Sequence, residues 1–310
     1  MAITSDVDLL ADLVRSGNRR AVARAISIVE DRREDADRLL SLLYRVESSP
    51  SVVGITGAPG AGKSTLTAQL ITHLRASDLA VAVVAVDPSS PFSGGAILGD
   101  RIRMQHHVSD RDVYVRSMST RGHLGGLADA TSRVLSILCA AGFDVVIVET
   151  VGVGQSETEI VGSADTTVVV VTPGWGDGIQ AAKAGLLEIA DVFVINKADL
   201  GGVDEVERDL RQMLELGGPT DWDVPIVRTN AVDAAGIGDL WSAVARHTEY
   251  LSTGGRGAAR KRRQIEDLVR RAARSELIDR IERQPVPAEL LDRVIDGSID
   301  PWAAARELIS

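Results

Sequence analysis

The chain has 310 residues, of which 45% are hydrophobic and 25% charged, and it carries a formal net charge of −10 at neutral pH. This length and composition allow one substantial buried core with further segments around it. The negative charge argues against nucleic acid or an anionic membrane surface as a partner of the whole chain. The single cysteine, Cys139, excludes an internal disulfide and any site of paired cysteines, and we expect it to pack in the core.

The sequence contains no stretch of the roughly 18 apolar residues that a membrane helix requires. Its first residues, MAITSDVDLLADLVRSGN, do not show the basic region followed by an apolar region that is typical of a secretory signal. We therefore expect a cytoplasmic protein that does not bind membranes.

The first part of the chain predicts a small group of helices. Apolar residues recur at helical spacing through residues 6–47, with breaks at Gly17 and before Glu34. Pro50 marks the end of this pattern, because proline disfavours helix in the residue before it and lacks a backbone donor. We expect a helical N-terminal extension over residues 1–48.

From residue 49 to residue 252, short apolar strands alternate with amphipathic helices. This pattern is typical of an α/β fold with a mostly parallel sheet covered by helices on both faces. The predicted strands are 52–56, 80–86, 113–115, 145–149, 166–172, 192–196 and 225–228. Such sheets bind ligands at the carboxyl ends of their strands. Polar residues lie at that end of four strands: Asp87, Glu149, Asn196 and Thr229.

The sequence STGGRG at residues 252–257 predicts a linker. A charged helical pattern follows over residues 260–283, and a final helical pair follows QPVP at residues 284–287. The basic residues of the charged helix could contact nucleic-acid phosphates. Apolar residues at helical spacing in the same stretch favour a helix with a solvated basic face instead. We expect no nucleic-acid binding by residues 253–310.

Residues 57–64, GAPGAGKS, fit the phosphate-loop pattern G-x-x-x-x-G-K-[ST], with a predicted strand before them and a helical pattern after them. Glycines let the backbone curl so that its N–H groups point at phosphate oxygens, and the helix that starts there adds its positive dipole end. We expect Lys63 to reach the β- and γ-phosphates and assist catalysis, and Ser64 to ligate Mg²⁺. The predicted phosphate-binding residues are Gly57, Ala58, Pro59, Gly60, Ala61, Gly62, Lys63, Ser64 and Thr65.

The strand at 192–196 runs into the sequence NKAD at residues 196–199, which indicates guanine recognition. The Asp199 carboxylate can accept hydrogen bonds from the guanine N1–H and exocyclic amine, and adenine offers neither donor. Asn196 would support the loop and the purine edge, and the Lys197 side chain would cover the base. A backbone N–H that could contact the guanine oxygen follows the next strand, in Asn230, Ala231 or Val232.

The metal and hydrolysis region follows the strand at 145–149. Glu149 and Gly152 stand where many GTPases show Asp-x-x-Gly, so Glu149 can hold Mg²⁺ through water and Gly152 can turn its N–H toward the γ-phosphate. Asp87 is the candidate for orienting the attacking water, with Asp100 near the metal. The alternative is that these two acids only cap the helices that follow. The predicted metal ligands are Ser64, Asp87, Asp100 and Glu149. The sequence shows no obvious catalytic glutamine or arginine finger, and Gln155, near the right region, could face toward the site or away from it, so we expect slow turnover that a partner accelerates.

Together, five segments resemble the MeaB/ArgK-type P-loop GTPases that are associated with methylmalonyl-CoA mutase, and the resemblance covers nearly the whole chain. The segments are GAPGAGKST at 57–65, DPSSPFSGGAILGDRIRM at 87–104, ETVGVGQSE at 149–157, PGWGDGIQAAKAG at 173–185 and NKAD at 196–199. One departure is that Asn230-Ala231 stands where the family has a base-contacting Ser-Ala.

The resemblance implies a helical N-terminal extension, a central GTPase domain and a helical C-terminal arm over residues 253–310 that forms a homodimer. It implies a Mg²⁺-dependent GTPase, binding GTP and GDP, that acts as a chaperone of the adenosylcobalamin enzyme methylmalonyl-CoA mutase, gating cofactor loading and protecting the enzyme. It also implies that Asp177 and Lys183 sense the nucleotide and signal to the mutase. The glycines around Asp177 indicate a flexible loop after a strand.

Two other functions fit the same phosphate loop. The first is a P-loop kinase or ATPase linked to amino-acid transport, and the guanine motif argues against it. The second is a GTPase metallochaperone for another enzyme. The chain has five histidines, no histidine-rich tract and one cysteine, so it lacks the clustered soft ligands that such a carrier uses.

Overall fold

The structure is a computed structural model that describes residues 6–31, 34–44, 50–87, 110–119, 126–150, 152, 162–174, 189–217 and 221–309. The chain divides into two compact units, Met1–Gln264 and Ile265–Ser310.

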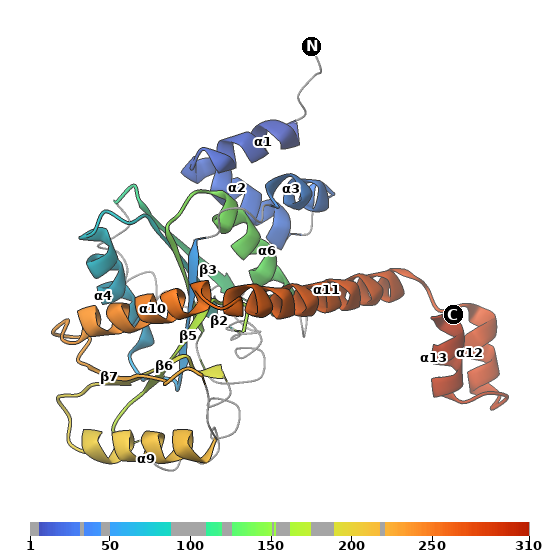
Figure 1. Cartoon of the computed structure of the whole chain (residues 1–310). Coiled ribbons are helices and arrows are strands. Elements are labelled where there is room, and N and C mark those ends of the chain that lie inside the picture. The colour runs from blue at the N-terminus through green and yellow to red at the C-terminus, as the bar shows by residue number, and fades with distance from the viewer. Residues whose placement is uncertain are drawn as a thin grey trace. The chain divides into compact units, whose positions relative to one another are not determined.

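A seven-stranded parallel sheet forms the centre of the first unit (Figure 1). Its strands lie in the order β3-β2-β4-β1-β5-β6-β7. The strands are β1 (Ser51–Gly57), β2 (Val81–Asp87), β3 (Val113–Ser119), β4 (Val145–Thr150), β5 (Thr166–Val171), β6 (Val192–Asn196) and β7 (Ile226–Thr229). The predicted α/β class is confirmed, and each predicted strand is present with small shifts at its ends.

Strand β3 differs most from its prediction, which places the end of the strand at Val115. The apolar pattern stops at Arg116, yet the strand continues to Ser119. The extra residues pair with β2 in register through Ala85↔Ser117 and Asp87↔Ser119, and Met118 between them is buried in the core, so pairing and burial together extend the strand.

Helices cover both faces of the sheet because alternate strand residues point to opposite sides. On one face, Val53 and Ile55 of β1 pack with α4 (Lys63–Arg75) and α10 (Ile237–Ser252). On the other face, Val52 of β1 and its neighbours pack with α6 (Gly126–Ala140). Helix α9 (Val203–Leu216) covers β5 and β6 on that second face through Val169 and Phe193.

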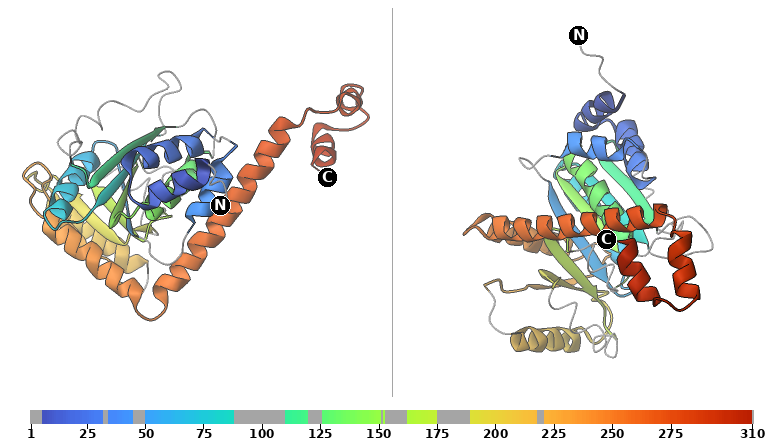
Figure 2. Two further views of the ribbon diagram at one scale, coloured as in Figure 1. Left: turned by 90° about the horizontal axis from the view of Figure 1, so that it is seen from above. Right: turned by 90° about the vertical axis from the view of Figure 1, so that its right-hand side faces the viewer.

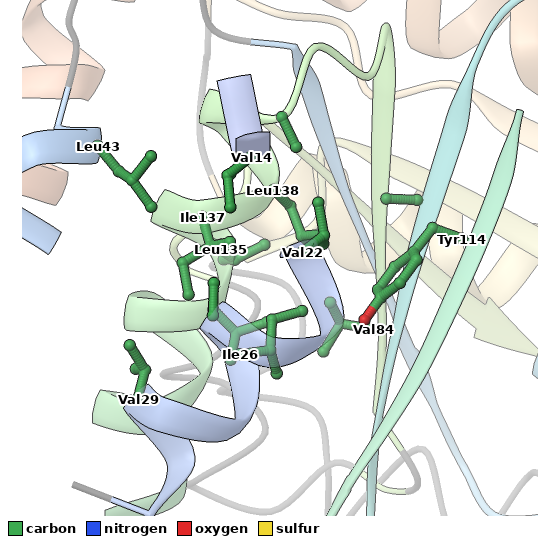
Figure 3. Packing of buried hydrophobic residues seen from close by; sticks show 14 of the residues in the cluster. Val14, Val22, Ile26, Val29, Leu43, Val84, Tyr114, Leu135, Ile137 and Leu138 are labelled. Atoms are coloured by element: carbon green, nitrogen blue, oxygen red, sulfur yellow. The ribbon is translucent and has the colours of Figure 1, made fainter. Parts of the chain in front are cut away.

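Three N-terminal helices extend the core that α6 forms with the sheet. They are α1 (Asp6–Arg15), α2 (Arg19–Glu30) and α3 (Ala36–Leu43). Asn18 caps the start of α2, because its side chain accepts hydrogen bonds from the backbone N–H groups of the first turn. Figure 3 shows Val22 and Ile26 of this helix beside Ile137 and Leu138 of α6, and all four side chains are fully buried. The apolar faces of the three helices are therefore buried against the sheet-bearing part of the chain.

Helix α11 (Arg256–Arg283) follows α10 after a break at Thr253–Gly255, and its first turns are fixed to the sheet. The Arg260 guanidinium donates to both carboxylate oxygens of Asp191, at 3.0 and 2.7 Å. His247 of α10 lies with Nε2 3.3 Å from the same carboxylate and Nδ1 2.8 Å from the Thr166 hydroxyl oxygen. We call Asp191, His247 and Arg260 the arm anchor. It lies at the amino ends of β5 and β6, opposite the edge where ligands bind in such sheets.

Within the arm anchor, burial lowers the pKa of His247. His247 is 1% exposed, and this burial lowers the pKa of its imidazole, with a further lowering from Arg260 and a partial offset from the Asp191 carboxylate. The neutral imidazole is therefore the form that the fold favours.

The second unit consists of the end of α11, α12 (Ala288–Ile295) and α13 (Pro301–Leu308); Figure 2 shows α11 as one continuous helix. Arg293 of α12 and Glu307 of α13 form a two-bonded ion pair at 2.7 and 3.0 Å. Many apolar side chains of this unit are exposed: Val269, Leu277, Ile278, Leu291, Ile295 and Trp302. Within the part of the chain that the structure describes, no helix is both long and apolar enough to span a membrane.

Candidate nucleotide-binding site

The phosphate-loop sequence has the strand before it and the helix after it that the pattern requires, because β1 ends at Gly57 and α4 begins at Lys63. Gly57 has a φ of 146°, and a Cβ there would lie 2.1 Å from the Val170 carbonyl oxygen. Gly62 precedes the helix in the left-handed region, with a φ of 88°, and its Cβ would lie 2.5 Å from Asn196 Nδ2. Both positions therefore require glycine for space as well as for backbone conformation.

The Lys63 ammonium lies against the backbone of the loop. Its Nζ donates to the carbonyl oxygens of Gly57 and Ala58 at 2.7 and 2.8 Å, and the residue is only 6% exposed. These carbonyl dipoles compensate for the water that the buried charge has lost. The positive charge is thus held at the loop where a phosphate would bind.

Ser64 and Glu149 bring two oxygen ligands together beside the loop. The Ser64 hydroxyl donates to Glu149 Oε1 at 2.5 Å, and both residues are buried. Ser64 lies in the first turn of α4, which follows β1 after the phosphate loop. Glu149 lies on β4, which pairs with β1 through Ile55↔Glu149, so the sheet brings the two residues together. A hydroxyl and a carboxylate are hard ligands suited to Mg²⁺, which takes one or two carboxylates and fills its other positions with water and substrate phosphates. The donor set therefore fits this ion, although no group of three or more His, Cys, Asp or Glu among the described residues could hold a metal by itself.

Asn196 connects the phosphate loop to the loop after β7. Its Nδ2 donates to the Ala61 carbonyl oxygen at 2.8 Å. Its Oδ1 accepts from the Thr229 hydroxyl at 3.0 Å and from the Ala231 backbone N–H at 3.1 Å. Because Asn196 is 2% exposed, these three bonds satisfy polar groups that water does not reach. The side chain fixes two ligand-facing loops relative to each other.

The residues after Asn196 are exposed at the same edge of the sheet. Lys197 has a left-handed φ of 59°, which turns the chain so that Lys197 and Asp199 both lie at the surface. In the loop after β7, Ala231 N–H donates to Asn196 and Val232 N–H donates to the Asn230 side chain. For either N–H to contact a bound base, it would have to give up its present hydrogen-bond acceptor.

Comparison with known proteins identifies the family. A sequence model of the family described as "Methylmalonyl Co-A mutase-associated GTPase MeaB" matches residues 22–286. The chain belongs to the MeaB family.

Individual relatives agree with this assignment. A protein of Pyrococcus abyssi that is named as a GTPase is 45% identical over 96% of this chain and 94% of its own length. The mouse protein named "Methylmalonic aciduria type A homolog, mitochondrial" is 30% identical over 98% of this chain and 79% of its own. The crystal structure of a LAO/AO transport system kinase is 27% identical, covers 97% of this chain and 96% of that one, and superposes with a TM-score of 0.69. This MeaB-family chain is a P-loop GTPase.

The predicted residues of this MeaB-family site around the phosphates and the metal can be placed as follows. Those of the phosphate loop, together with Glu149 and Asn196, are brought together at the carboxyl edge of β1, β4 and β6. Asp87 is the last residue of β2 and reaches the same edge, since β2 pairs with β4 up to Val86↔Thr150. The residues outside the described part of the chain are Asp100, Gln155, Asp177 and Lys183.

Two buried threonines of the site were not predicted. Thr56 and Thr150 contact each other through their hydroxyl groups and both lie within hydrogen-bonding distance of the Gly152 carbonyl oxygen. Sequence offers little signal for them, because threonine is common in strands for its branched shape alone. Only their position, directly before Gly57 and directly after Glu149, would have singled them out.

Proposed function

We propose that this chain is a Mg²⁺-dependent GTPase that regulates an adenosylcobalamin-dependent methylmalonyl-CoA mutase, gating loading of its cofactor and protecting the loaded enzyme. The family description, which names association with methylmalonyl-CoA mutase, supports this client. The mouse relative named for methylmalonic aciduria supports it as well.

The observation that carries the chemical part of the proposal is the buried cluster of Lys63, Ser64 and Glu149 at the phosphate loop. Lys63 binds the β- and γ-phosphates of GTP in place of its present carbonyl acceptors. Ser64 and Glu149 hold Mg²⁺, Glu149 through water. The ion, when bound, neutralises charge that develops on the phosphates during transfer.

The reaction that we propose is attack of a water oxygen on the γ-phosphorus, with cleavage of the bond to the β,γ-bridging oxygen. GDP leaves, and both protons of the water end on inorganic phosphate. Asp87 orients the water and Asp100 assists at the metal. The N–H of Gly152 contacts the γ-phosphate. Asp87→Asn removes the carboxylate that orients the water, so it should slow hydrolysis more than it weakens GTP binding. Measurements of kcat and of the Kd for GTP test this.

Guanine is recognised by the loops at the ends of β6 and β7. The exposed Asp199 carboxylate accepts from guanine, Lys197 covers the base, and Asn196 holds the loops in place. The residues Asn230, Ala231 and Val232 form the other wall of the base site.

We propose a homodimer that is formed by residues 253–310, with residues 1–48 as the N-terminal extension and residues 49–252 as the GTPase domain. The exposed apolar side chains of the second unit support this, because such surface is costly to leave in water. The full chain should run as a dimer in light scattering, and Ile295→Asp should shift it toward monomer. Leu216→Asp in α9 is the matched control, since both side chains are 82% exposed. If Ile295→Asp has the same mass as the wild-type chain in light scattering, the proposed interface is contradicted.

A second candidate is a kinase linked to amino-acid transport, which the printed title of the LAO/AO transport system kinase suggests. The two functions differ in the acceptor of the γ-phosphate. Labelled GTP should deliver its γ-phosphate to water in our proposal, whereas label on an amino acid or a transport protein would favour the kinase.

Mutase binding in different nucleotide states tests the proposed client. The full chain should bind purified methylmalonyl-CoA mutase with an affinity that differs between GDP and a non-hydrolysable GTP analogue. Asp177→Ala and Lys183→Ala should retain GTP hydrolysis and lose this nucleotide-dependent difference. If the chain hydrolyses GTP but binds the mutase in no nucleotide state, the GTPase activity stands and the mutase is not its client.

A further inference from the structure

A chain of two threonine hydroxyls lies directly beneath the phosphate loop. Thr56 is the residue before Gly57, and Thr150 is the residue after Glu149, on the neighbouring strand. Thr56 Oγ1 donates to the Gly152 carbonyl oxygen at 2.8 Å, and Thr150 Oγ1 donates to Thr56 Oγ1 at 3.0 Å. Both threonines are at most 1% exposed, so water does not replace these bonds.

The hydrogen bonds that link Thr150, Thr56 and Gly152 run in one direction. A threonine hydroxyl has one proton to donate and can still accept. Thr56 gives its proton to Gly152 across the shorter distance, which leaves its oxygen to accept from Thr150. Thr150 also lies 3.3 Å from the Gly152 carbonyl oxygen, as a longer second acceptor. Hydrogen bonds in such a chain polarise and strengthen one another in a buried environment.

We propose that Thr56 and Thr150 are positioning residues that hold Gly152 beside the phosphate loop, so that the site distinguishes GTP from GDP. This rests on the proposed function, in which the Gly152 N–H contacts the γ-phosphate. The two strands that carry the threonines also carry Gly57 and Glu149, so the hydroxyl chain ties Gly152 to the same rigid elements that place the phosphate loop and the metal ligand.

Holding Gly152 in place changes the free energy of binding GTP relative to that of binding GDP. GDP has no γ-phosphate, so a contact from Gly152 contributes only to the affinity for GTP. If Gly152 is already held in place, GTP binding does not have to order it, and the contact contributes in full. Without the hydroxyls, ordering of Gly152 must accompany triphosphate binding and offsets part of the gain. The threonines therefore affect the ratio of the two affinities.

Substitutions of matched shape test this role. Thr56→Val removes both bonds of Thr56 while keeping the branched shape, whereas Thr150→Val removes the bond to Thr56 and the longer contact with Gly152. Affinities for GDP and for β,γ-imido-GTP are measured with Mg²⁺ on the full chain. We expect the preference for the triphosphate to fall about three- to tenfold in Thr56→Val, which is the effect of one buried hydrogen bond. The fall should be smaller in Thr150→Val, and Thr56→Ser should restore the wild-type ratio.

Two results would overturn the inference. Equal loss of affinity for GDP and for the analogue in Thr56→Val would mean that the hydroxyls only stabilise the fold. A ratio that Thr56→Ser does not restore would mean that the hydroxyl is not the group that acts. Melting temperatures of all variants identify general destabilisation. GTP hydrolysis by the wild-type chain is measured separately: its absence would count against the proposed function, whereas an unchanged ratio in both valine variants would count only against the threonines.

Discussion

Replacement of Asn196 by alanine tests the central connection of the site. The substitution removes the bonds from Nδ2 to the Ala61 carbonyl and from Thr229 and Ala231 to Oδ1. Each buried bond contributes about 1 kcal/mol net, so the free energy of unfolding should fall by about 3 kcal/mol. For a unit of 264 residues this corresponds to a fall in melting temperature of roughly 5–6 °C.

The assay is urea and thermal unfolding of the nucleotide-free protein, because bound nucleotide would add stability of its own. Asn230→Ala is the matched control. The Asn230 amide is partly exposed and bonds only within its own loop, to Asp233 and to the Val232 N–H, so its loss should cost under about 1 kcal/mol. If Asn196→Ala and Asn230→Ala unfold at the same urea concentration, Asn196 does not connect the loops in the way that we describe.

Three further substitutions have distinct expected results. Gly57→Ala should abolish stable folding or GDP binding, because its Cβ would lie 2.1 Å from a backbone oxygen. Gly60→Ala meets nothing within 4 Å and bears only the strain of a positive φ of 76°, so it should remain folded. Equal melting curves and GDP titrations of the two variants would contradict the clash. Asp199→Asn should chiefly reduce the preference for GTP over ATP, and an unchanged ratio would remove the assignment of the base contact. His247→Gln should reduce the loss of stability on acidification: burial lowers the pKa of His247, so below its ordinary value of 6.5 the unfolded chain takes up the proton first and the wild type loses stability as pH falls. A difference in melting temperature between wild type and His247→Gln that does not vary with pH would refute this.

The sheet can be predicted from sequence because its strands are short runs of β-branched residues that are buried on both faces. Val192–Asn196 is an example, since every residue in it is buried. The phosphate loop is predictable because the backbone needs its glycines locally: Gly57, Gly60 and Gly62 all have a positive φ.

Other features depend on contacts between distant parts of the chain, and sequence alone gives no means to find them. The end of β3 is mostly polar, and the structure extends it as a strand through its pairing with β2 and the burial of Met118. His247 looks like an ordinary residue of an amphipathic helix, and its role in the arm anchor depends on Asp191, which is 56 residues away along the chain. The three hydrogen-bond partners of Asn196 likewise come from the phosphate loop, from β7 and from the loop after β7.

The most direct test of the central proposal is the rate of GTP hydrolysis by the purified chain with and without purified methylmalonyl-CoA mutase, with ATP as a parallel control. We expect slow hydrolysis of GTP by the chain alone, acceleration by the mutase, and no comparable effect with ATP. A rate of GTP hydrolysis that the mutase leaves unchanged, at concentrations where GTP is bound, would contradict the proposed regulation of this client.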